Sequence, residues 1–361
     1  MIELETTTLV VGSGPAGFAA AYYAAAAGTV LVVDAHQLPR SKSCGGMIHP
    51  LTLDILAEIA TLPDRLLLTP PRVTFRYHAW DTDQTCLTDL SFINVDRADF
   101  DTWLLEQLPG NIEIMDKTVY KSHVSQADGS IRVTLAHEGQ ETVVTCQYLV
   151  GADGARSSVR RQLGLADLEK FVTLQDFCIM QGEFEPIFDC FWLDDIEEFG
   201  IGYIVPKSDL ILVGVVYYPG TRQASQLQDR ILTRLRQRLP IGDSVRREAW
   251  VAPKHRSIRD VSAGIGNVLL AGEAGGFISP TSGEGISWAL ASGRAAGKAI
   301  ATAATASQPA SALQAYNRGV AHLRRSIAWR LRVFPIINSR WGKKLMRITP
   351  QKLISAITHH L

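Results

Sequence analysis

The pattern of hydrophobic and polar positions changes its period several times along the chain. Near the N-terminus it predicts a strand over residues 7–11, a helix over 16–27 and a second strand over 30–33. The strands are rich in β-branched residues and the helix is rich in alanine. A strand, a helix and a returning strand in this order form a βαβ unit, so the chain begins as an α/β domain.

The same criteria predict a second group of elements before residue 151. This group is a hairpin near 72–93, a helix over 97–108, strands over 111–123 and 130–135 with a turn at Asp128-Gly129, and a strand over 143–150.

Residues 170–252 follow a different pattern, with mostly short strands around one amphipathic helix at 225–239. This pattern is typical of a separate antiparallel sheet. A strand over 267–271 and a helix over 285–304 then return to the first domain, and the remaining C-terminal stretch is predicted to be helical.

These elements predict a discontinuous domain organisation. An α/β domain takes residues 1–70, 94–168 and 255–318, an inserted antiparallel-sheet domain takes 71–93 and 169–254, and a helical segment takes 319–361. A chain of 361 residues is longer than a typical single domain, and with 46% hydrophobic and 20% charged residues it can bury a sizeable core.

Charge and cysteine content exclude some classes of function. Lysine plus arginine and aspartate plus glutamate number 36 each, which argues against a nucleic-acid partner. The five cysteines are scattered and form no CxxC pair, so we expect neither a metal site nor a disulfide framework. Because no disulfide framework is expected, we expect a location in the reducing cytoplasm. The N-terminus lacks the basic region of a signal peptide, and the alanine-rich run is too short to span a membrane.

The C-terminal part of the chain has an uneven charge. From Gly285 to Leu361 there is no aspartate or glutamate, while arginine and lysine recur among aromatic and aliphatic residues. One interpretation is peripheral contact with an anionic membrane surface or a lipid headgroup. The other is a solvated helical face whose apolar side lies in the core.

A glycine-rich loop connects the first strand to the first helix. Its sequence, Gly12-Ser13-Gly14-Pro15-Ala16-Gly17, allows a tight turn, and the helix N-terminus supplies free N–H groups for a pyrophosphate. Asp34, followed by Ala35, ends the second strand 22 residues after Gly12, where its carboxylate can accept hydrogen bonds from ribose hydroxyls. The sequence therefore predicts a dinucleotide site.

Two later segments indicate which dinucleotide is bound. Residues 150–160, with Asp153-Gly154, and residues 269–277, with Gly272-Glu273, resemble the DG motif and the second FAD motif of the para-hydroxybenzoate-hydroxylase superfold. Residues 94–101 also match this superfold, and the resemblance implies that Arg97 lies beside FAD. In the family an acid touches the ribityl chain. Here this acid is Glu273, which is one methylene longer than the usual aspartate, so its carboxylate must reach the ribityl chain in a different orientation.

The resemblance implies a fold as well as a cofactor. We expect an α/β protein with a Rossmann-type FAD-binding domain of the hydroxylase-like GR2 type, an inserted antiparallel-sheet substrate domain and a helical C-terminus.

Three segments resemble one branch of this superfold, the geranylgeranyl reductases. They are residues 42–50 with Cys44-Gly45-Gly46-Met47, residues 278–286 with Pro280 and Gly283-Glu284-Gly285-Ile286, and residues 202–206 with Tyr203. In the last segment Tyr203 and Val205 replace the usual tryptophan and phenylalanine, which weakens the isoprenoid assignment. The Cys-Gly-Gly loop and the Gly-Glu-Ala stretch at 272–274 are most similar to small bacterial CbrA-like members.

The resemblance also implies roles for single residues. Cys44 would lie over the isoalloxazine, as a proton donor or as a residue that shapes the pocket. His49 would be an acid or a hydrogen-bonding residue of the loop, and Tyr203 would be catalytic or pack in the substrate sheet. The loop Pro280–Gly285 opens a helix, so its N–H groups can face the negatively charged edge of reduced flavin.

The leading functional hypothesis is an FAD-dependent reductase of carbon–carbon double bonds in a lipid or isoprenoid-like hydrophobic substrate. One alternative is a monooxygenase or halogenase that acts on a small hydrophobic substrate through a C4a-(hydro)peroxyflavin. Another alternative is a membrane-associated FAD protein with mainly a binding role. Because no second glycine fingerprint is visible, the electron donor is either transiently bound NAD(P)H or a ferredoxin-like protein.

Overall fold

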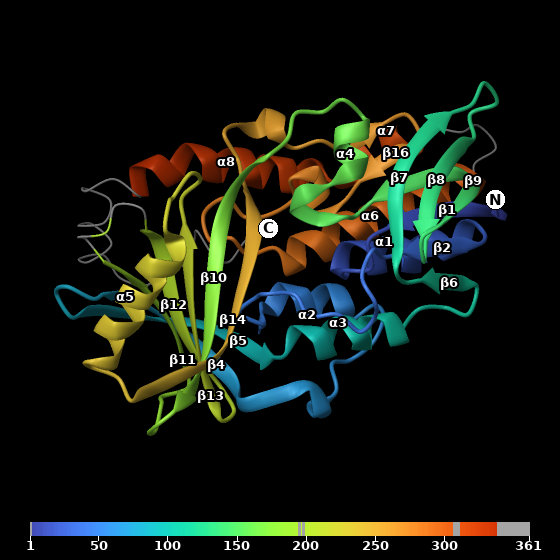
Figure 1. Cartoon of the computed structure of the whole chain (residues 1–361). Helices are drawn as coiled ribbons and strands as arrows, with labels where there is room; N and C mark the ends of the chain where they lie inside the picture. The colour runs from blue at the N-terminus through green and yellow to red at the C-terminus, as the bar shows by residue number, and fades with distance from the viewer. Residues whose placement is uncertain (1, 194–195, 197–198, 306–310, 338–361) are drawn as a thin grey trace.

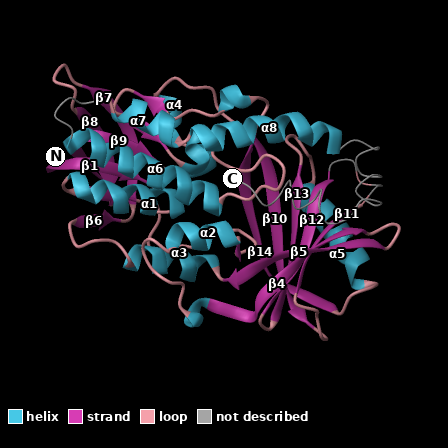
Figure 2. Cartoon of the chain, turned by 180° about the vertical axis from the view of Figure 1, so that it is seen from behind, coloured by secondary structure: helices cyan, strands magenta, loops and turns pink. Residues whose placement is uncertain are grey.

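A computed structural model of the chain describes residues 2–193, 196, 199–305 and 311–337, and shows two sheets side by side with helices between and above them (Figures 1 and 2). Each sheet contains eight strands. The first sheet has the strand order β15-β16-β9-β1-β2-β6, with β7 and β8 continuing from β9. Its strands are β1 (Ile2–Val11), β2 (Val30–Val33), β6 (Ile112–Met115), β7 (Thr118–Ser125), β8 (Ile131–His137), β9 (Gln140–Gly151), β15 (Gly264–Ile265) and β16 (Val268–Leu270).

Strands β16, β9, β1, β2 and β6 pair in parallel, and this is the core of the predicted Rossmann-type α/β domain. Helices α1 (Pro15–Ala24) and α6 (Ile286–Thr305) pack against each other beside this sheet (Figure 1). A Cβ added at Gly293 of α6 would collide with the backbone carbonyl of Ala16. The small residues of both helices therefore allow their backbones to touch.

The second sheet has the order β14-β10-β13-β12-β11-β4-β5-β3. Its strands are β3 (Met47–Ile48), β4 (Leu67–Ala79), β5 (Gln84–Val95), β10 (Glu169–Met180), β11 (Ile187–Trp192), β12 (Phe199–Lys207), β13 (Leu210–Tyr217) and β14 (Ile241–Lys254). Helix α5 (Ala224–Arg236) packs Ile231, Leu232 and Leu235 onto one face of this sheet.

Three details of the prediction were wrong. The second sheet is mixed, because β11 pairs in parallel with β4 from the hairpin that precedes it in the chain. Its strands β10 and β14 have 12 and 14 residues and are not short. The segment predicted as one strand over 111–123 divides into β6 and β7, which pair with different strands of the first sheet, and Lys117 between them adopts a left-handed backbone conformation that ends the extended run.

The remaining helices connect or cover the two sheets. They are α2 (Pro50–Leu56), α3 (Arg97–Glu106), α4 (Ser158–Gln162), α7 (Ala312–Gly319), α8 (Ala321–Ile337) and the short 3₁₀ helices η1 (Ala25–Ala27), η2 (Asp64–Leu66), η3 (Gly154–Arg156), η4 (Ile258–Asp260) and η5 (Gly272–Gly275). The predicted helical C-terminus is thus present up to residue 337, and the prediction for 338–361 lies outside the described residues. The Tyr316 hydroxyl donates a hydrogen bond to the Leu270 carbonyl at 2.8 Å and ties α7 to the first sheet.

The hydroxylase-like fold class predicted from the sequence is confirmed by this architecture, while the domain boundaries stay a prediction. Strand membership places residues 47–48, 67–79 and 84–95 in the second sheet. In the part of the chain that the structure covers, we find no helix of the length and hydropathy needed to cross a bilayer.

Candidate functional site

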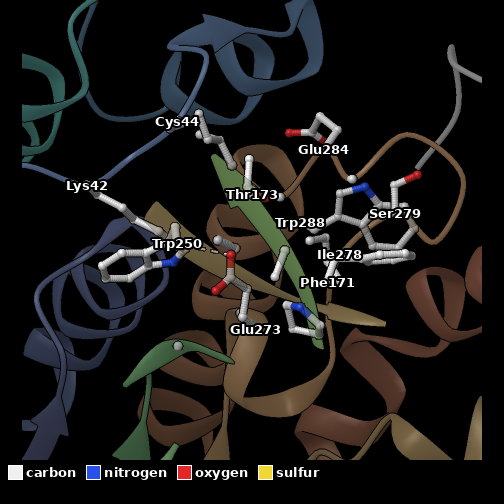
Figure 3. A pocket seen from close by; sticks show the side chains of 18 of the residues that line it. Lys42, Cys44, Phe171, Thr173, Trp250, Glu273, Ile278, Ser279, Glu284 and Trp288 are labelled. Carbon is white, nitrogen blue, oxygen red and sulfur yellow. Dashed lines mark hydrogen bonds and ion pairs between the residues drawn. The ribbon is translucent and has the colours of Figure 1, made fainter. Parts of the chain in front are cut away.

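One cavity of about 780 Å³ lies between the two sheets. Its walls come from the glycine loop, the segment 33–51, the turns at 152–156 and 272–289, the facing side of the second sheet and helix α8. Figure 3 shows Cys44, Thr173, Glu273 and Glu284 around this space, on segments that are far apart in the sequence.

The glycine loop forms one end of the cavity. Gly12, Gly14, Pro15 and Ala16 line it, and the N-terminus of α1 carries no side-chain cap, so its first N–H groups are available to a ligand. Gly17 does not line the cavity. A Cβ at Gly17 would collide with the Gly12 carbonyl oxygen, so this glycine serves the contact between loop and helix.

Asp34 and Ala35 lie beside this loop, as predicted for a ribose-binding position. The Asp34 carboxylate accepts hydrogen bonds from the Ser13 backbone N–H at 3.0 Å, the Ser13 hydroxyl at 2.6 Å and Arg40 Nε at 3.2 Å. Burial alone would raise the pKa of Asp34, but the Arg40 guanidinium and the Ser13 hydrogen bonds hold this pKa below its usual range. Asp34 is therefore ionised and able to accept further donors. Sequence reasoning missed Arg40, which lies in a loop without a motif.

Glu273 lies in η5, next to Gly272, and its two carboxylate oxygens have different surroundings. Oε1 accepts from Lys42 Nζ at 3.2 Å, whereas Oε2 is buried and has no hydrogen-bond partner in the described structure. A buried carboxylate oxygen without a donor is costly. The longer side chain thus turns one oxygen to Lys42 and leaves the other in need of a ligand hydroxyl.

Asp153 and Gly154 line the cavity, but the Asp153 carboxylate points to its own helix. It accepts hydrogen bonds from the backbone N–H groups of Ser158 at 2.6 Å and Val159 at 3.2 Å. Burial raises the pKa of Asp153. Its side chain therefore fixes the turn before α4, and only the turn itself faces the cavity.

The loop from Pro280 to Ile286 forms another wall, and Pro280, Gly283, Glu284, Gly285 and Ile286 all line the cavity. The Glu284 carboxylate accepts from the Ser287 N–H at 2.9 Å and the Ser287 hydroxyl at 2.6 Å. Burial raises the pKa of Glu284. Since Glu284 itself takes up an N–H group of α6, fewer of these groups remain for a flavin than the sequence suggested.

The Cys-Gly-Gly loop faces the cavity through Cys44, Gly45 and Met47. The Cys44 sulfur accepts from the Gly46 N–H at 3.5 Å, and Gly46 itself packs against Val95 and Lys207 instead of lining the cavity. Lys207 Nζ donates to the Val95 carbonyl at 3.0 Å, and burial lowers the pKa of Lys207 to about 7.

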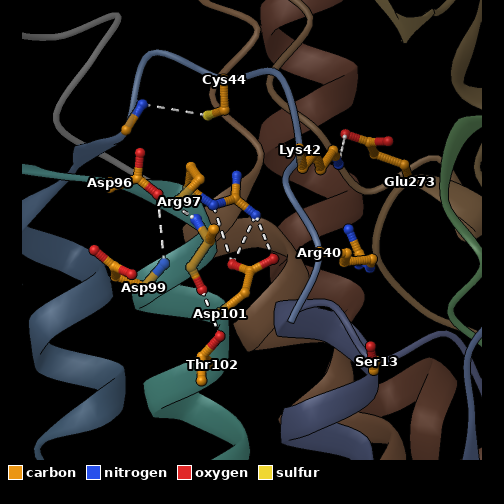
Figure 4. A network of polar contacts seen from close by, with 12 residues as sticks. Ser13, Arg40, Lys42, Cys44, Asp96, Arg97, Asp99, Asp101, Thr102 and Glu273 are labelled. Atoms are coloured by element: carbon orange, nitrogen blue, oxygen red, sulfur yellow. Dashed lines mark hydrogen bonds and ion pairs between the residues drawn. The ribbon is translucent and has the colours of Figure 1, made fainter. Parts of the chain in front are cut away.

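Arg97 lines the cavity below this loop and is buried (Figure 4). Its guanidinium forms a bidentate pair with Asp101, with distances of 2.9–3.1 Å. Burial would lower the pKa of Arg97, but Asp101 and Cys44 raise it, so the arginine stays charged next to the cavity. The pair fixes Arg97 on α3.

Tyr203 and His49, the other two predicted catalytic residues, both line the cavity. Gln175 Nε2 donates to the Tyr203 hydroxyl oxygen, and the Ser43 hydroxyl donates to Gln175 Oε1 at 2.6 Å. Because Tyr203 accepts from Gln175, its own proton points elsewhere, and burial raises the pKa of Tyr203 above its usual range. His49 Nδ1 accepts from the Leu51 N–H at 3.1 Å and caps α2, so His49 makes a hydrogen bond within its own loop, which is the second of the two roles considered for it. The catalytic roles of Cys44, His49 and Tyr203 stay predictions.

The second sheet gives the cavity an aromatic wall that no sequence motif indicated. Phe75, Tyr77, Phe92, Phe188 and Trp192 line it. Phe75 stacks edge to face against Tyr77 at 4.6 Å and against Phe188 at 5.3 Å between ring centroids. This half of the cavity is suited to an apolar ligand.

The sequence of this chain is similar to one protein family and to curated relatives. Residues 5–332 match the family model described as FAD binding domain. Protein CbrA of Escherichia coli O9:H4 (strain HS) is 28% identical over 323 residues, which cover 87% of this chain and 85% of that protein. The predicted similarity to CbrA-like proteins is confirmed.

Solved structures show the same fold. A geranylgeranyl bacteriochlorophyll reductase-like protein from Thermoplasma acidophilum superimposes with a TM-score of 0.83 at 18% identity, covering 99% of this chain and 96% of that chain. Aklavinone-11 hydroxylase, in a ternary complex with FAD and aklavinone, superimposes with a TM-score of 0.72 at 21% identity, covering 99% and 73%.

The cavity agrees with the family match, because it joins a glycine loop with an uncapped helix N-terminus, an ionised acid at the end of β2 and a buried carboxylate oxygen without a donor. These groups fit the pyrophosphate and the hydroxyls of FAD. The chain belongs to the FAD-binding-domain family and is an FAD-dependent oxidoreductase with the hydroxylase-like fold.

Proposed function

We propose that this protein reduces carbon–carbon double bonds in a hydrophobic, lipid-like or isoprenoid-like substrate. The observation that carries the proposal is the aromatic wall of the second sheet, which continues directly from the FAD-binding half of the same cavity. Bound FAD supplies the two-electron redox chemistry of such a reaction. The protein must then bind the alkene, exclude water and supply one proton.

The aromatic wall performs the first two of these tasks. Phe75, Phe92 and Phe188 are in mutual edge-to-face contact, so they present a stiff apolar surface to a ligand. An apolar chain bound against them displaces water and gains roughly 25 cal/mol for each Å² that it buries.

Tyr203 is suited to the proton transfer. Its hydroxyl is fixed by Gln175, and its raised pKa keeps it protonated at neutral pH. Cys44 lies on the Cys-Gly-Gly loop, and Gly45 of that loop lies against the Tyr203 ring, so the thiol is a second donor near the same place. We propose Tyr203 as the donor and Cys44 as a residue that shapes the pocket.

The test is anaerobic. FAD-loaded protein is reduced with dithionite, excess reductant is removed, and prenyl and other apolar alkenes are added while flavin absorbance is followed. We expect reoxidation of the flavin together with a product that carries two additional hydrogen atoms. We also expect the Tyr203→Phe variant to be slower by a factor of about 100 or more, as for the loss of a general acid. A flavin that stays reduced with every alkene would refute the proposal.

A second candidate is oxygenation, because aklavinone-11 hydroxylase shares the fold and the aromatic wall would also hold a planar ring. It is distinguished by admitting oxygen in the same assay. Incorporation of an oxygen or halogen atom into the ligand, with no anaerobic turnover, would favour this candidate. In either case we propose that the electron donor binds transiently.

A further inference from the structure

Helix α8 has two faces with different surroundings. On the inner face, Leu323, Ile327 and Arg330 are buried, and Arg330, Leu331 and Pro335 reach the cavity. On the outer face, every third or fourth residue is exposed to solvent. These residues, the outer stripe, are His322, Arg325, Trp329, Arg332 and Ile336.

The outer stripe combines apolar and basic side chains in an unusual way for a solvated helix. Trp329 is 46% exposed and Ile336 is 68% exposed. Among the tryptophan, tyrosine and phenylalanine side chains whose exposure the structure describes, Trp329 is the one that is exposed. An indole between cations is the pattern of a helix that lies in a membrane interface, where the ring enters the headgroup region and the cations meet lipid phosphates.

The charges of α8 are divided between the two faces. Arg324 donates to the Val261 carbonyl at 2.9 Å, and Arg330 donates to the Thr281 hydroxyl at 3.2 Å and lies over the Trp288 ring, so these two arginines hold the helix on the protein. Arg325 and Arg332 point outward.

The sequence around α8 strengthens the positive charge. No aspartate or glutamate follows Glu284 in the chain. Helix η4, which packs against α8, carries the exposed Arg259, and its acid Asp260 accepts from the backbone N–H groups of Arg256 and Ser257. An anionic surface is therefore the complementary partner.

We propose that the outer stripe of α8 binds the surface of an anionic lipid bilayer. Both Figure 1 and Figure 2 show α8 along one edge of the molecule, where a flat surface can reach it. Because the inner face of the same helix forms a wall of the cavity, the bound protein holds this wall about one helix diameter, roughly 10 Å, from the lipid. The proposal does not depend on which reaction the cavity performs.

The experiment uses the full FAD-loaded chain and vesicles of two compositions, phosphatidylcholine alone or an equal mixture of phosphatidylcholine and phosphatidylglycerol. Co-sedimentation gives the partition coefficient, and brominated lipids report tryptophan insertion by quenching. The test variants are Trp329→Phe, Trp329→Ser and the double variant Arg325→Glu/Arg332→Glu. The matched control is Arg222→Glu/Arg230→Glu, which makes the same charge change at exposed positions in and before α5.

We expect binding to the phosphatidylglycerol vesicles that weakens with salt, and little binding to phosphatidylcholine alone. Each arginine at such a surface contributes a factor of about five, so the α8 double variant should lose at least about twentyfold in partitioning while the α5 control stays close to wild type. Trp329→Ser should also bind more weakly, and Trp329→Phe should remove most of the quenching. Equal loss in both double variants, quenching that persists in Trp329→Phe, or no vesicle binding at low salt would overturn the proposal.

Discussion

Two acids of the cavity form ion pairs with basic residues of one loop. Glu273 meets Lys42 from the loop after β2, and Asp34 meets Arg40 from the same loop. Both acids lie where the FAD motifs place cofactor contacts. The loop after β2 therefore supplies the basic partner of each acid that the cofactor would also touch. The site is thus already ordered by its own ion pairs.

Glu273 offers a direct test of cofactor binding. Glu273→Gln keeps the size of the side chain but removes the charge and half of the acceptor capacity for ligand hydroxyls. We expect the dissociation constant of FAD, measured by quenching of flavin fluorescence, to rise about tenfold, which corresponds to roughly 1.4 kcal/mol. Glu113→Gln, an exposed acid on β6, is the control and should bind FAD like wild type. Equal affinity in the two variants would contradict the assigned contact.

Lys207 gives the protein a pH-dependent stability. Burial lowers its pKa from 10.5 to about 7, so between these values the unfolded chain binds a proton that the folded chain has released. Stability therefore rises with pH across this window, and the cost of the buried charge is largest below pH 7.

We predict that Lys207→Met is stabilised relative to wild type most strongly below about pH 7, and that the difference shrinks as the pH approaches 10.5. Urea denaturation at several pH values measures it. Lys121→Met, at an exposed position, is the control. A wild-type-to-variant difference that stays constant over the window would show that Lys207 is charged throughout.

At the scale of elements, the position of the cofactor loop depends on how closely α1 and α6 approach. Gly293 and Gly297 of α6 lie against the backbone of α1, which begins at the glycine loop. Any separation of the helices therefore moves Gly14 and Pro15 as well. The packing of α1 against α6 is in this way coupled to the position of the glycine loop in the cavity.

Gly293→Ala tests this coupling. The added Cβ would collide with the Ala16 carbonyl, and overpacking of this kind costs about 1–3 kcal/mol, more than the roughly 1 kcal/mol that alanine gains in helix propensity. We expect a lower free energy of unfolding and weaker FAD binding. Gly110→Ala, where a Cβ meets no neighbouring atom, should change neither quantity. Normal stability and affinity in Gly293→Ala would show that the helices can shift freely.

At the scale of the whole molecule, the sequence predicted the parts whose signals are local. The glycine loop, Asp34 and the segments at 153–154, 272–273 and 280–286 all line one cavity, as their motifs implied. Contacts across the two sheets have no local signal. Gln175, Lys207 and the aromatic wall act through partners more than 100 residues away in sequence or on other strands, so strand pairing had to be known first.

The same reason explains the errors at the level of elements. The break at Lys117 is set by pairing of β6 with β2 and of β7 with β8, and nothing in the alternation of 111–123 marks it. The parallel pairing of β4 with β11 joins segments that only the complete sheet brings together. Local periodicity predicts strands, whereas their neighbours follow from the packing of the whole chain.

The central claim is that one cavity holds FAD at its glycine-loop end and an apolar substrate against the second sheet. A crystal structure of the protein with FAD tests it most directly. We predict the pyrophosphate at Gly14, the ribityl chain beside Glu273 and the flavin ring between the Cys44 loop and the Pro280–Gly285 loop, with Phe75, Phe92 and Phe188 left accessible. An FAD molecule bound elsewhere, or one whose flavin ring fills the space against these three aromatic residues, would contradict the account.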